Sequence, residues 1–542
     1  MNNSLTSSVP VLIAGGGPTG ATLAIELLRR GVACRIVDRL DAPAATSRSF
    51  TLHARTLELF EMAGIVDLFL EAGMRNVSMD YHFQGVEASA RLDFTQLESR
   101  YPFTLIINQN VTEEMLRRHL ATLGARVEWG TQLRSLSRAA DGRITAVLAH
   151  QPSGEEEMVQ TDWLIGCDGV HSTVRKQLDL PFEGDEYTGM QMRMMDVPLT
   201  GFPLADDRIH YFIARDRMLL IVKLPGPNYR VLISDMSGAP PTEAARSAFQ
   251  AVADEHFHGS VELGEPEWAT VFRIWRRVTP SYRQGRVFLA GDAAHCHSPA
   301  GGQGMNACIQ DAFNLGWKLA MVIRGEAYET ILDSYERERQ PIAAQLIEGT
   351  HALHGIIMDH GTSIVQRIAR SREPGFSRQA VRRISGLAYH YRDDIAAPSR
   401  PLLPGGLSPG DRVPDARLNA RRRLHDLLRH PAYTLLLFPH ASDPAHELEA
   451  LANEVEAGFG DCVRVAAVTS AGQRATAPAG AIVAESDEVH RLYGAVGSAS
   501  LCLVRPDGYL RVRCRLSDKD ALFAALEVDL RPSRHASDAL SR

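Results

Sequence analysis

The chain has 542 residues, which is too long for one hydrophobic core and predicts two to three domains. Its net charge of −7 and its scattered Lys and Arg residues exclude the basic stripe of a nucleic-acid-binding or membrane-surface protein. We find no apolar run of the ~20 residues that a membrane span needs, and Met1–Val9 lacks the features of a signal peptide. The seven cysteines are dispersed and odd in number, which favours a reducing, cytoplasmic location.

The chain opens with a pattern typical of a βαβ unit. We expect a strand at Val11–Ala14, a helix at Ala21–Arg30 that ends before Gly31, and a second strand at Ala33–Val37. Asp38 follows that strand directly. The opening therefore predicts a parallel α/β sheet.

The turn inside this unit carries the pattern G-x-G-x-x-G at Gly15, Gly17 and Gly20. The first glycine permits a tight turn, the second lets a pyrophosphate approach the backbone, and the third allows close packing of helix on strand. Phosphate binds well at a helix N-terminus, and an acid about 20 residues further on can accept from ribose hydroxyls. A glycine turn without ligand is the alternative, but the flanking strand, helix and acid favour a dinucleotide contacted by Gly15, Gly17, Pro18, Thr19, Gly20, Asp38 and Arg39.

The middle of the chain is rich in predicted strands. Residues 182–280 are expected to form a sheet domain over the substrate, with strands at His210–Phe212, Met218–Leu224 and Tyr229–Ser234. Arg286–Ala290 is expected to return to the first domain as a buried strand. The dinucleotide domain would then comprise residues 1–181 and 281–396, with a long helix at Gly304–Ile323 and a helix pair over 333–360.

The C-terminal part follows a stretch rich in proline and glycine. Residues 397–415 are expected to be a linker, and residues 416–530 a small unit in which strands and helices alternate, which suggests a thioredoxin-like domain. Its strands are expected at Tyr433–Phe438, Val463–Val468, Leu501–Val504 and Leu510–Cys514, with a turn at 506–509. It has no Cys-x-x-Cys pair, so we expect a structural role there, and a frayed tail over 531–542.

Two further strings make the chain recognisable. Cys167–Arg175, with the sequence CDGVHSTVR, resembles the Asp-Gly motif of flavoprotein aromatic hydroxylases. Arg286–His295, with the sequence RVFLAGDAAH, resembles their Gly-Asp motif. The chain therefore resembles the group A flavoprotein monooxygenases, and strings at 100–103, 108–110, 209–213, 223–230, 296–299 and 391–393 resemble one member of that family in particular. The resemblance implies an α/β fold: a Rossmann-like FAD domain, an inserted β-sheet substrate domain and a C-terminal thioredoxin-like domain.

The resemblance also implies a cofactor site. FAD would be bound, and NADPH or NADH would act as co-substrate without a second glycine fingerprint. Asp292 would accept from the ribityl chain, and the N-terminus of the helix after Gly301 would face the flavin, where its positive dipole end stabilises negative charge. Residues implied at the flavin, its pyrophosphate or the nicotinamide nucleotide are Arg48, Gln109, Asp168, Arg175, Asp292, Gly302, Gly304, Met305 and Asn306, and Pro299 would line the face where oxygen reacts. A surface arginine and a helix-cap glutamine are the plain alternatives for Arg48 and Gln109.

The chemistry implied is hydroxylation of a phenol. In this family NAD(P)H reduces the flavin, O₂ then gives a C4a-hydroperoxide, and one oxygen atom is added ortho or para to a phenolate. Tyr211 is our first choice as hydrogen-bond partner of the phenolate, and His53, which could exchange a proton near neutral pH, is the second. A packed strand tyrosine and a capping or surface histidine are the alternatives. Met190, Met192, Met194, Met195 and Met218 could form a soft apolar wall or plain core.

Other assignments follow more weakly. The run His295-Cys296-His297 cannot converge on one tetrahedral ion, so no metal site is predicted. We see no arginine cluster for a substrate carboxylate, which favours simple phenols over hydroxybenzoates. A fused aromatic such as a polyketide is an alternative substrate, and a non-catalytic flavin-binding protein is an alternative function, against which Asp168, Asp292 and Pro299 argue. The expected partners are a small aromatic, O₂ and a second copy of the chain in a homodimer, with no nucleic acid or membrane.

Overall fold

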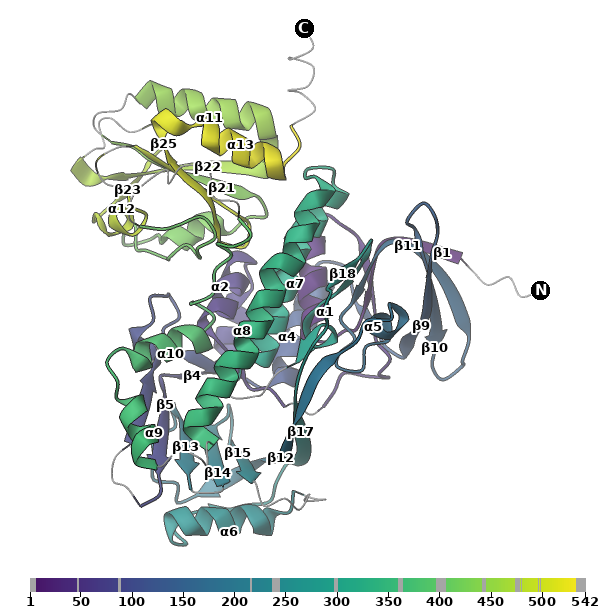
Figure 1. Ribbon diagram of the computed structural model, residues 1–542, viewed down its shortest axis with the longest axis vertical. Coiled ribbons are helices and arrows are strands. Elements are labelled where there is room, and N and C mark those ends of the chain that lie inside the picture. The colour runs from purple at the N-terminus through teal and green to yellow at the C-terminus, as the bar shows by residue number, and fades with distance from the viewer. Residues whose placement is uncertain are drawn as a thin grey trace.

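The computed structural model describes residues 6–45, 48–85, 89–214, 217–235, 244–296, 301–358, 364–395, 406–440, 445–472, 478, 480–495, 497 and 499–532. Two sheet-based units lie together, and a third unit is set at one end of the molecule (Figure 1). Within these residues, no helix combines the length and the apolar character that crossing a bilayer requires.

The first sheet has a parallel core around β1 (Thr6–Ala14), whose Val11, Leu12 and Ile13 are fully buried. Its order is β18 (Arg283–Gln284), β19 (Val287–Leu289), β11 (Glu156–Gly166), β1, β2 (Cys34–Val37) and β8 (Val127–Glu128). The strands β10 (Ile144–His150) and β9 (Thr131–Arg138) extend β11 in antiparallel fashion. Against this sheet pack α4 (Gln109–Thr122), α1 (Pro18–Leu28) and α7 (Gly304–Ile323), with α1 in the middle. The predicted Rossmann-like α/β fold is confirmed.

The second sheet is largely antiparallel. Its order is β20 (His295–Cys296), β17 (Trp268–Val278), β12 (Glu183–Thr200), β15 (Asn228–Asp235), β14 (Arg217–Lys223), β13 (Arg208–Ile213), β5 (Ser78–Phe83) and β6 (Ser89–Asp93), with β16 (Glu262–Leu263) beside β12. One face packs against α6 (Arg246–Phe257) and the other against the first unit. Since β5 and β6 come from the segment assigned to the FAD domain, this sheet is not confined to residues 182–280.

The helical segments join the two sheets. A small sheet of β3 (Thr51–Leu52), β7 (Thr104–Ile106) and β4 (Met74–Asn76) lies near α2 (Ala54–Met62) and α3 (Val66–Ala72), and α5 (Thr173–Gln177) follows β11. The helix α8 spans Asp333–Met358 without interruption, so the prediction of a helix pair over 333–360 was wrong. Pro341 lies inside it and removes one helical hydrogen bond, but packing along α7 keeps the helix continuous. The shorter helices α9 (Ile364–Ser371) and α10 (Phe376–Ile384) follow.

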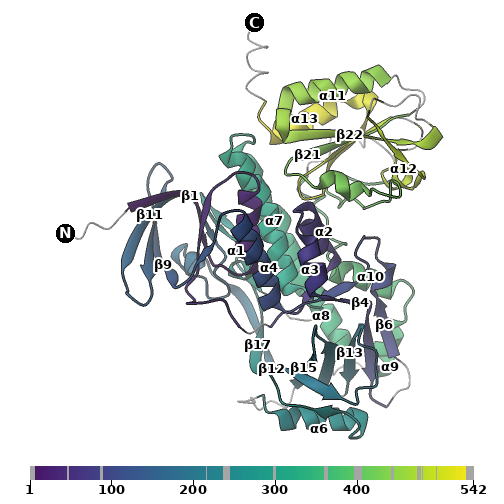
Figure 2. The ribbon, with the colours of Figure 1, turned by 180° about the vertical axis from the view of Figure 1, so that it is seen from behind.

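The C-terminal unit has the strand order β23 (Ile482–Ala484), β22 (Val463–Ser470), β21 (Tyr433–Phe438), β24 (Ser500–Val504) and β25 (Leu510–Arg515). The first three strands are parallel, β24 pairs with β21 in antiparallel fashion, and β25 pairs with β24 in antiparallel fashion. The helices α11 (Ala445–Phe459) and α13 (Asp520–Asp529) lie together on one face, and α12 (Glu488–Leu492) lies apart from them (Figure 2). The topology fits the expectation of a thioredoxin-like unit, which stays a prediction.

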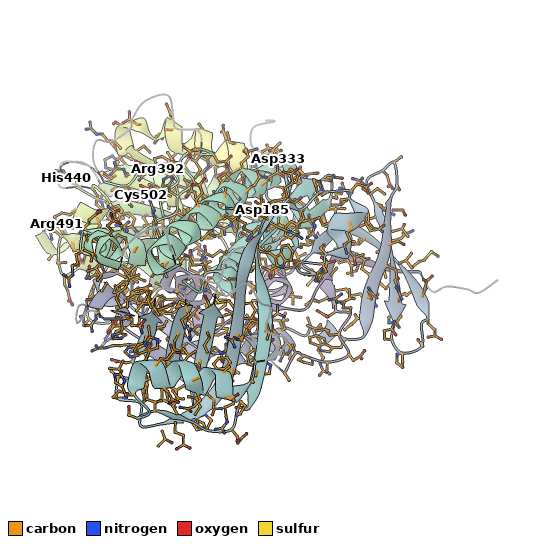
Figure 3. All side chains as sticks on the ribbon, turned by 60° about the horizontal axis from the view of Figure 1, so that its bottom comes forward. Asp185, Asp333, Arg392, His440, Arg491 and Cys502 are labelled. Atoms are coloured by element: carbon orange, nitrogen blue, oxygen red, sulfur yellow. The ribbon has the colours of Figure 1, made fainter. Side chains whose placement is uncertain are left out.

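The predicted linker is only partly a linker. Residues 396–405 lie outside the described residues, but 406–415 pack against the C-terminal sheet. Val413 is fully buried and its N–H donates to the Gly508 carbonyl at 3.0 Å, and the Gly410 N–H donates to the Leu510 carbonyl at 2.7 Å. Arg392, from the end of the first unit, donates to Asp411 at 2.6 Å and lies between α8 and the C-terminal unit (Figure 3). Of the predicted tail, 533–542 lie outside the described residues.

Candidate active site

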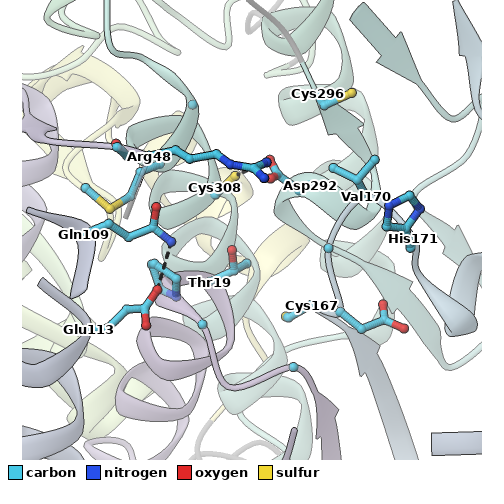
Figure 4. Close-up of a pocket in the computed structure, with 18 of the residues that line it drawn as sticks. Thr19, Arg48, Gln109, Glu113, Cys167, Val170, His171, Asp292, Cys296 and Cys308 are labelled. Carbon is cyan, nitrogen blue, oxygen red and sulfur yellow. Dashed lines mark hydrogen bonds between the residues drawn. The ribbon is translucent and has the colours of Figure 1, made fainter. Parts of the chain in front are cut away.

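A cavity of about 700 Å³ runs between the first sheet and β17 of the second sheet. This volume is typical of a site for a cofactor-sized ligand. Its walls come from segments far apart in the sequence: Gly15–Thr19 except Gly16, Val37–Leu40, Arg48–Thr51, Gln109 and Glu113, Thr131–Leu133, Cys167–His171 and Thr173, Trp268–Trp275 in part, Asp292, Cys296, Gly302, Gly304, Met305 and Cys308. Figure 4 shows part of this lining. Of the segments described, none from the C-terminal unit contributes to the wall.

The glycine turn packs tightly against the protein on one side and leaves free space on the side of the cavity. Gly15 has φ +109°, and a Cβ there would lie 2.2 Å from the Cys167 carbonyl oxygen. A Cβ on Gly20 would lie 1.9 Å from the Gly15 carbonyl oxygen, whereas one on Gly17 would meet nothing within 4 Å. Backbone atoms therefore leave no room for a Cβ at Gly15 or Gly20, whereas the turn presents free space at Gly17, before the N-terminus of α1, where a pyrophosphate fits. Gly20 itself does not line the cavity.

Asp38 lies at the end of β2 and lines the cavity beside Arg39. Its Oδ2 accepts from the Gly16 N–H at 2.7 Å and its Oδ1 from the Leu40 N–H at 2.9 Å. These bonds hold the carboxylate at the rim next to the glycine turn. The geometry fits the predicted contact with a ribose, since a carboxylate oxygen can accept more than one hydrogen bond.

Asp168 also lines the cavity, and it caps α5. Its Oδ2 accepts from the N–H groups of Thr173 at 2.6 Å and Val174 at 3.2 Å, while its Oδ1 is buried and has no partner among the described residues. Burial raises the pKa of Asp168 above its ordinary value. An unpaired buried acceptor of this kind fits a ligand that donates a hydrogen bond, because leaving it unpaired costs free energy.

Arg175 differs from its predicted role, since it does not line the cavity. Its guanidinium donates to the carbonyls of Ala293 and Val170, each at 2.8 Å, and lies 3.9 Å from the Phe182 ring centre. All these contacts are within the protein. In this structure Arg175 ties α5 to the Gly-Asp motif rather than facing a cofactor.

The loop before α7 and the first residues of that helix form another wall. Gly302, Gly304 and Met305 line the cavity, and the Asp292 side chain is exposed into it, where Oδ1 accepts from the Cys308 thiol at 3.3 Å. A 20-residue helix with its N-terminus at the cavity presents a positive dipole end to a negatively charged ring. Pro299 lies outside the described residues.

Asn306 and His53 brace this turn from behind and do not line the cavity. Asn306 Nδ2 donates to the carbonyls of Gly302 and Thr51, each at 2.9 Å, and its Oδ1 accepts from the His53 N–H at 2.8 Å. His53 Nε2 donates to the Gly301 carbonyl at 2.7 Å, and Nδ1 lies 3.2 Å from the Thr104 hydroxyl, so the ring is neutral with its proton on Nε2.

The expectation that His53 exchanges a proton near neutral pH is therefore corrected. Its side chain is 1% exposed, and burial lowers the pKa of His53 from 6.5 to about 4. A neutral imidazole that bonds a loop carbonyl holds the turn in place. The site gives His53 a positioning role, which the sequence pattern could not reveal because burial is a property of the fold.

Arg48 and Gln109 both line the cavity, on its far side from His171 (Figure 4). The Arg48 side chain extends toward Asp292 in Figure 4, and its guanidinium lies 5.7 Å from the Phe272 ring centre. Gln109 Nε2 donates to Glu113 at 2.9 Å. Their placement is compatible with the predicted contacts to the cofactor.

Tyr211 does not line this cavity but lies on the adjoining face of the second sheet. Neighbouring strands place a row of inward residues across that face, beginning at the cavity wall: Thr270, Met194, Leu232, Leu220, Tyr211 and Tyr81. The rings of Tyr211 and Tyr81 stack at 4.8 Å. Burial raises the pKa of Tyr211 above its ordinary value, so its hydroxyl is a proton donor at neutral pH.

The methionines divide between the two faces. Met192, Met194 and Met218 belong to the core on the inward face, whereas Met195 packs toward α6 on the other. The side chain of Met190 lies outside the described part. Arg230 also lies on the inward face, where its Nε and Nη2 donate hydrogen bonds to the Asp196 carboxylate, both at 2.7 Å. This charge is thus already neutralised by a protein carboxylate.

Sequence reasoning missed the β17 wall, which comprises Trp268, Thr270, Phe272, Ile274 and Trp275. Apolar residues occupy both alternating sets of positions over 268–274, so the sequence marks neither face of this strand, and nothing in it indicates a ligand. The cysteines Cys167, Cys296 and Cys308 also line the cavity without having been predicted.

The fold and the cavity define an FAD-dependent enzyme, and comparison with known proteins bears this out. Residues 8–350 match the family described as FAD binding domain, and residues 407–530 match the family described as aromatic-ring hydroxylase, C-terminal. The chain belongs to the FAD-dependent aromatic hydroxylases, which are flavoprotein monooxygenases.

Particular relatives extend over nearly the whole chain. Pentachlorophenol 4-monooxygenase of Sphingobium chlorophenolicum is 44% identical over 528 residues, which covers 97% of each chain. This is the family member that the strings outside the flavin motifs resemble. The 6-methylpretetramide 4-monooxygenase of Streptomyces rimosus is 36% identical and covers 96% of this chain and 93% of its own length. The solved structure of OxyS anhydrotetracycline hydroxylase from Streptomyces rimosus is 30% identical, with a TM-score of 0.76, and covers 97% of this chain and 100% of its own.

Proposed function

We propose that the protein hydroxylates a substituted phenol, halogenated phenols included, with NAD(P)H and O₂ as co-substrates. The observation that carries the proposal is the apolar inward face of the second sheet, which continues from the cavity wall and presents Tyr211. Similarity to an enzyme named for pentachlorophenol supports the same substrate class.

FAD would be held by the glycine turn, Asp38, Arg48, Gln109, Asp292 and the N-terminal turn of α7. When bound, it supplies the redox chemistry: it takes electrons from NAD(P)H and activates O₂. The chain's own residues position the ring and exclude water. His53 and Asn306 keep the loop carbonyls of Gly301 and Gly302 in place, and the aromatic residues of β17 close the opposite wall. Asp168, with its unpaired Oδ1, is the residue we assign to both nucleotides.

Tyr211 would bind the phenol oxygen. A buried tyrosine that stays protonated can donate to a phenolate, which favours the ionised and more reactive ring. The inward rows are apolar apart from a few hydroxyls and the Arg230–Asp196 pair, in which the cation is already neutralised. This composition favours phenols without a carboxylate.

A fused aromatic ring system is the second candidate. It is favoured by the similarity over nearly the full length to enzymes named for 6-methylpretetramide and anhydrotetracycline. The two candidates differ in ring number, so a substrate panel separates them.

The test is substrate-stimulated oxidation of NADH and NADPH over substituted phenols, hydroxybenzoates and fused aromatics, with product identification. We expect coupled turnover and a hydroxylated or quinone product with phenols. Oxidation that yields only H₂O₂ with every compound would overturn the proposal in favour of a flavin protein that does not hydroxylate.

Tyr211→Phe tests the site within the same assay. We expect roughly a 10²- to 10³-fold loss of hydroxylation, the usual cost of removing one donor to a developing oxyanion, with FAD content unchanged. Tyr81→Phe is the matched control, because Tyr81 stacks on Tyr211 and its hydroxyl contacts Met79 Sδ at 3.8 Å. Equal turnover in wild type and Tyr211→Phe would remove Tyr211 from the site.

A further inference from the structure

The turn between β24 and β25 of the C-terminal unit is inserted into the first unit. Arg505, 4% exposed, donates to both carboxylate oxygens of Glu338 on α8, at 2.5 and 2.8 Å. It also donates to Asp507 Oδ2 at 2.6 Å. Arg55 of α2 donates to the Asp507 carbonyl from the other side. The turn thus touches both α2 and α8.

The contacts form a closed buried network of charges. Glu338 Oε2 also accepts from Lys318 Nζ at 2.8 Å and from Asn314 Nδ2 at 2.7 Å, both on α7. Burial would raise the pKa of Glu338, but Arg505 and Lys318 hold it well below its ordinary value. In such a network, removing one partner leaves the others charged and unpaired in the interior.

From this network a short path leads to the flavin site. Arg339 follows Glu338 on α8, and its Nε donates to Asp311 Oδ1 at 2.7 Å. Asp311 Oδ2 accepts from the Gly291 N–H at 3.1 Å and from His295 Nε2 at 2.6 Å. Gly291 precedes Asp292, whose side chain faces the cavity. Arg339 therefore bonds the same carboxylate that holds the backbone next to Asp292.

A second contact reaches the same arginine. Arg339 Nη1 donates to the Tyr391 hydroxyl at 3.1 Å, and the Tyr391 ring lies 4.1 Å from that of Tyr509, the last residue of the inserted turn. The turn is thus joined to Arg339 through Glu338 on one side and Tyr391 on the other.

We infer that the Arg505–Tyr509 turn positions the flavin site, and that Arg505 sets the affinity for FAD although no residue of its unit lines the described cavity. Arg505 fixes Glu338, and thereby the part of α8 from which Arg339 holds Asp311 and the Gly291–Asp292 backbone. This inference rests on FAD binding in the cavity, as proposed above. It makes the C-terminal unit a positioning element for the cofactor.

The test is FAD titration of the full-length apoprotein of Arg505→Met, with flavin fluorescence and the visible spectrum as readouts. We expect binding to weaken roughly 5- to 150-fold, the usual range of coupling between distant sites, with a shifted flavin band. Asp507→Asn keeps the shape of the turn and should give a smaller shift in the same direction. If Arg505→Met folds poorly, Asp507→Asn still tests the inference. Arg505→Lys should recover part of the affinity, since it restores the charge but not the paired contact with Glu338.

The matched control is Arg511→Met. Arg511 is a half-buried arginine on β25 whose Nε donates to Asp529 at 2.7 Å within the C-terminal unit. We expect it to lower the thermal midpoint without changing FAD affinity. Wild-type affinity and spectrum in both Arg505→Met and Asp507→Asn would overturn the inference. So would losses of affinity that simply follow the loss of stability in all variants. Failure of the wild-type apoprotein to bind FAD would instead reject the proposed flavin site.

Discussion

At the scale of single residues, His53 shows how burial changes a role. A histidine after a loop looks like an acid–base candidate, yet its imidazole is neutral and bonded to Gly301 and Thr104. The histidine is useful here because it can donate from one ring nitrogen and accept at the other, so it satisfies two buried groups at once.

The placement of His53 predicts a pH dependence of stability. Burial lowers the pKa of His53 from 6.5 to about 4, so between these values the unfolded chain binds a proton that the folded chain does not. The free energy of unfolding therefore falls as the pH drops through this window, by about 3 kcal/mol from this residue. His53→Gln, which keeps a donor and an acceptor but does not titrate, should be less sensitive to acid.

The measurement is the urea midpoint of both proteins at pH values from 7 to 4. His430, whose pKa burial also lowers to about 4, contributes in the same window and is common to both proteins. The prediction concerns the difference between the two slopes. Parallel curves would show that His53 is protonated as easily in the folded chain as in the unfolded one.

At the scale of elements, the sequence predicted those helices and strands whose bounds depend on neighbouring residues. The strand, glycine turn, helix and second strand of the opening were placed within a few residues, and α7 has the predicted bounds Gly304–Ile323. The partners of Asp311 could not be predicted, because Gly291 and Arg339 meet it only through the packing of α7 and α8. The same holds for β5, which joins a sheet built mostly from residues more than 100 positions later.

Gly302, just before α7, and Gly304, its first residue, allow a test of whether a glycine is needed for the backbone or for the ligand. Gly302 has φ +66°, and a Cβ there would lie 2.2 Å from Thr51 Oγ1. Gly302→Ala should therefore destabilise the apoprotein by about 1–3 kcal/mol and also weaken FAD binding. At Gly304 an added Cβ meets nothing within 4 Å, so Gly304→Ala should leave the apoprotein stable.

Because Gly304 lines the cavity, the added methyl group would project toward the bound ring. We expect FAD affinity to fall in Gly304→Ala without loss of apoprotein stability. Denaturation of the apoproteins and FAD titration distinguish the two substitutions. Equal apoprotein stability of Gly302→Ala and wild type would mean that the turn relaxes readily and does not need its left-handed backbone.

At the scale of the whole molecule, the C-terminal unit and the first unit share a buried apolar core. The apolar cluster of the C-terminal unit includes Leu59 and Met62 of α2 and Phe313 of α7, so part of its core belongs to the first unit. The predicted domain boundaries remain predictions. The sequence predicted a linker over 397–415 because proline and glycine are frequent there. Residues 406–415 are nonetheless packed, since their contacts come from parts of the chain that are distant in sequence.

This sharing predicts that the first 405 residues will not fold well alone. Truncation would expose the shared apolar cluster and remove Arg505, which leaves Glu338 and Lys318 in a network that has lost a charge. Breaking a buried ion pair by removing one partner typically costs about 3–5 kcal/mol, and the exposed core adds to that. We expect residues 1–405 to be largely insoluble or poor in FAD, whereas a chain lacking only 533–542 should match the full-length protein. Soluble fraction, thermal midpoint and FAD content measure the difference. A soluble 1–405 chain with full-length affinity for FAD would show that the first unit completes the flavin site by itself.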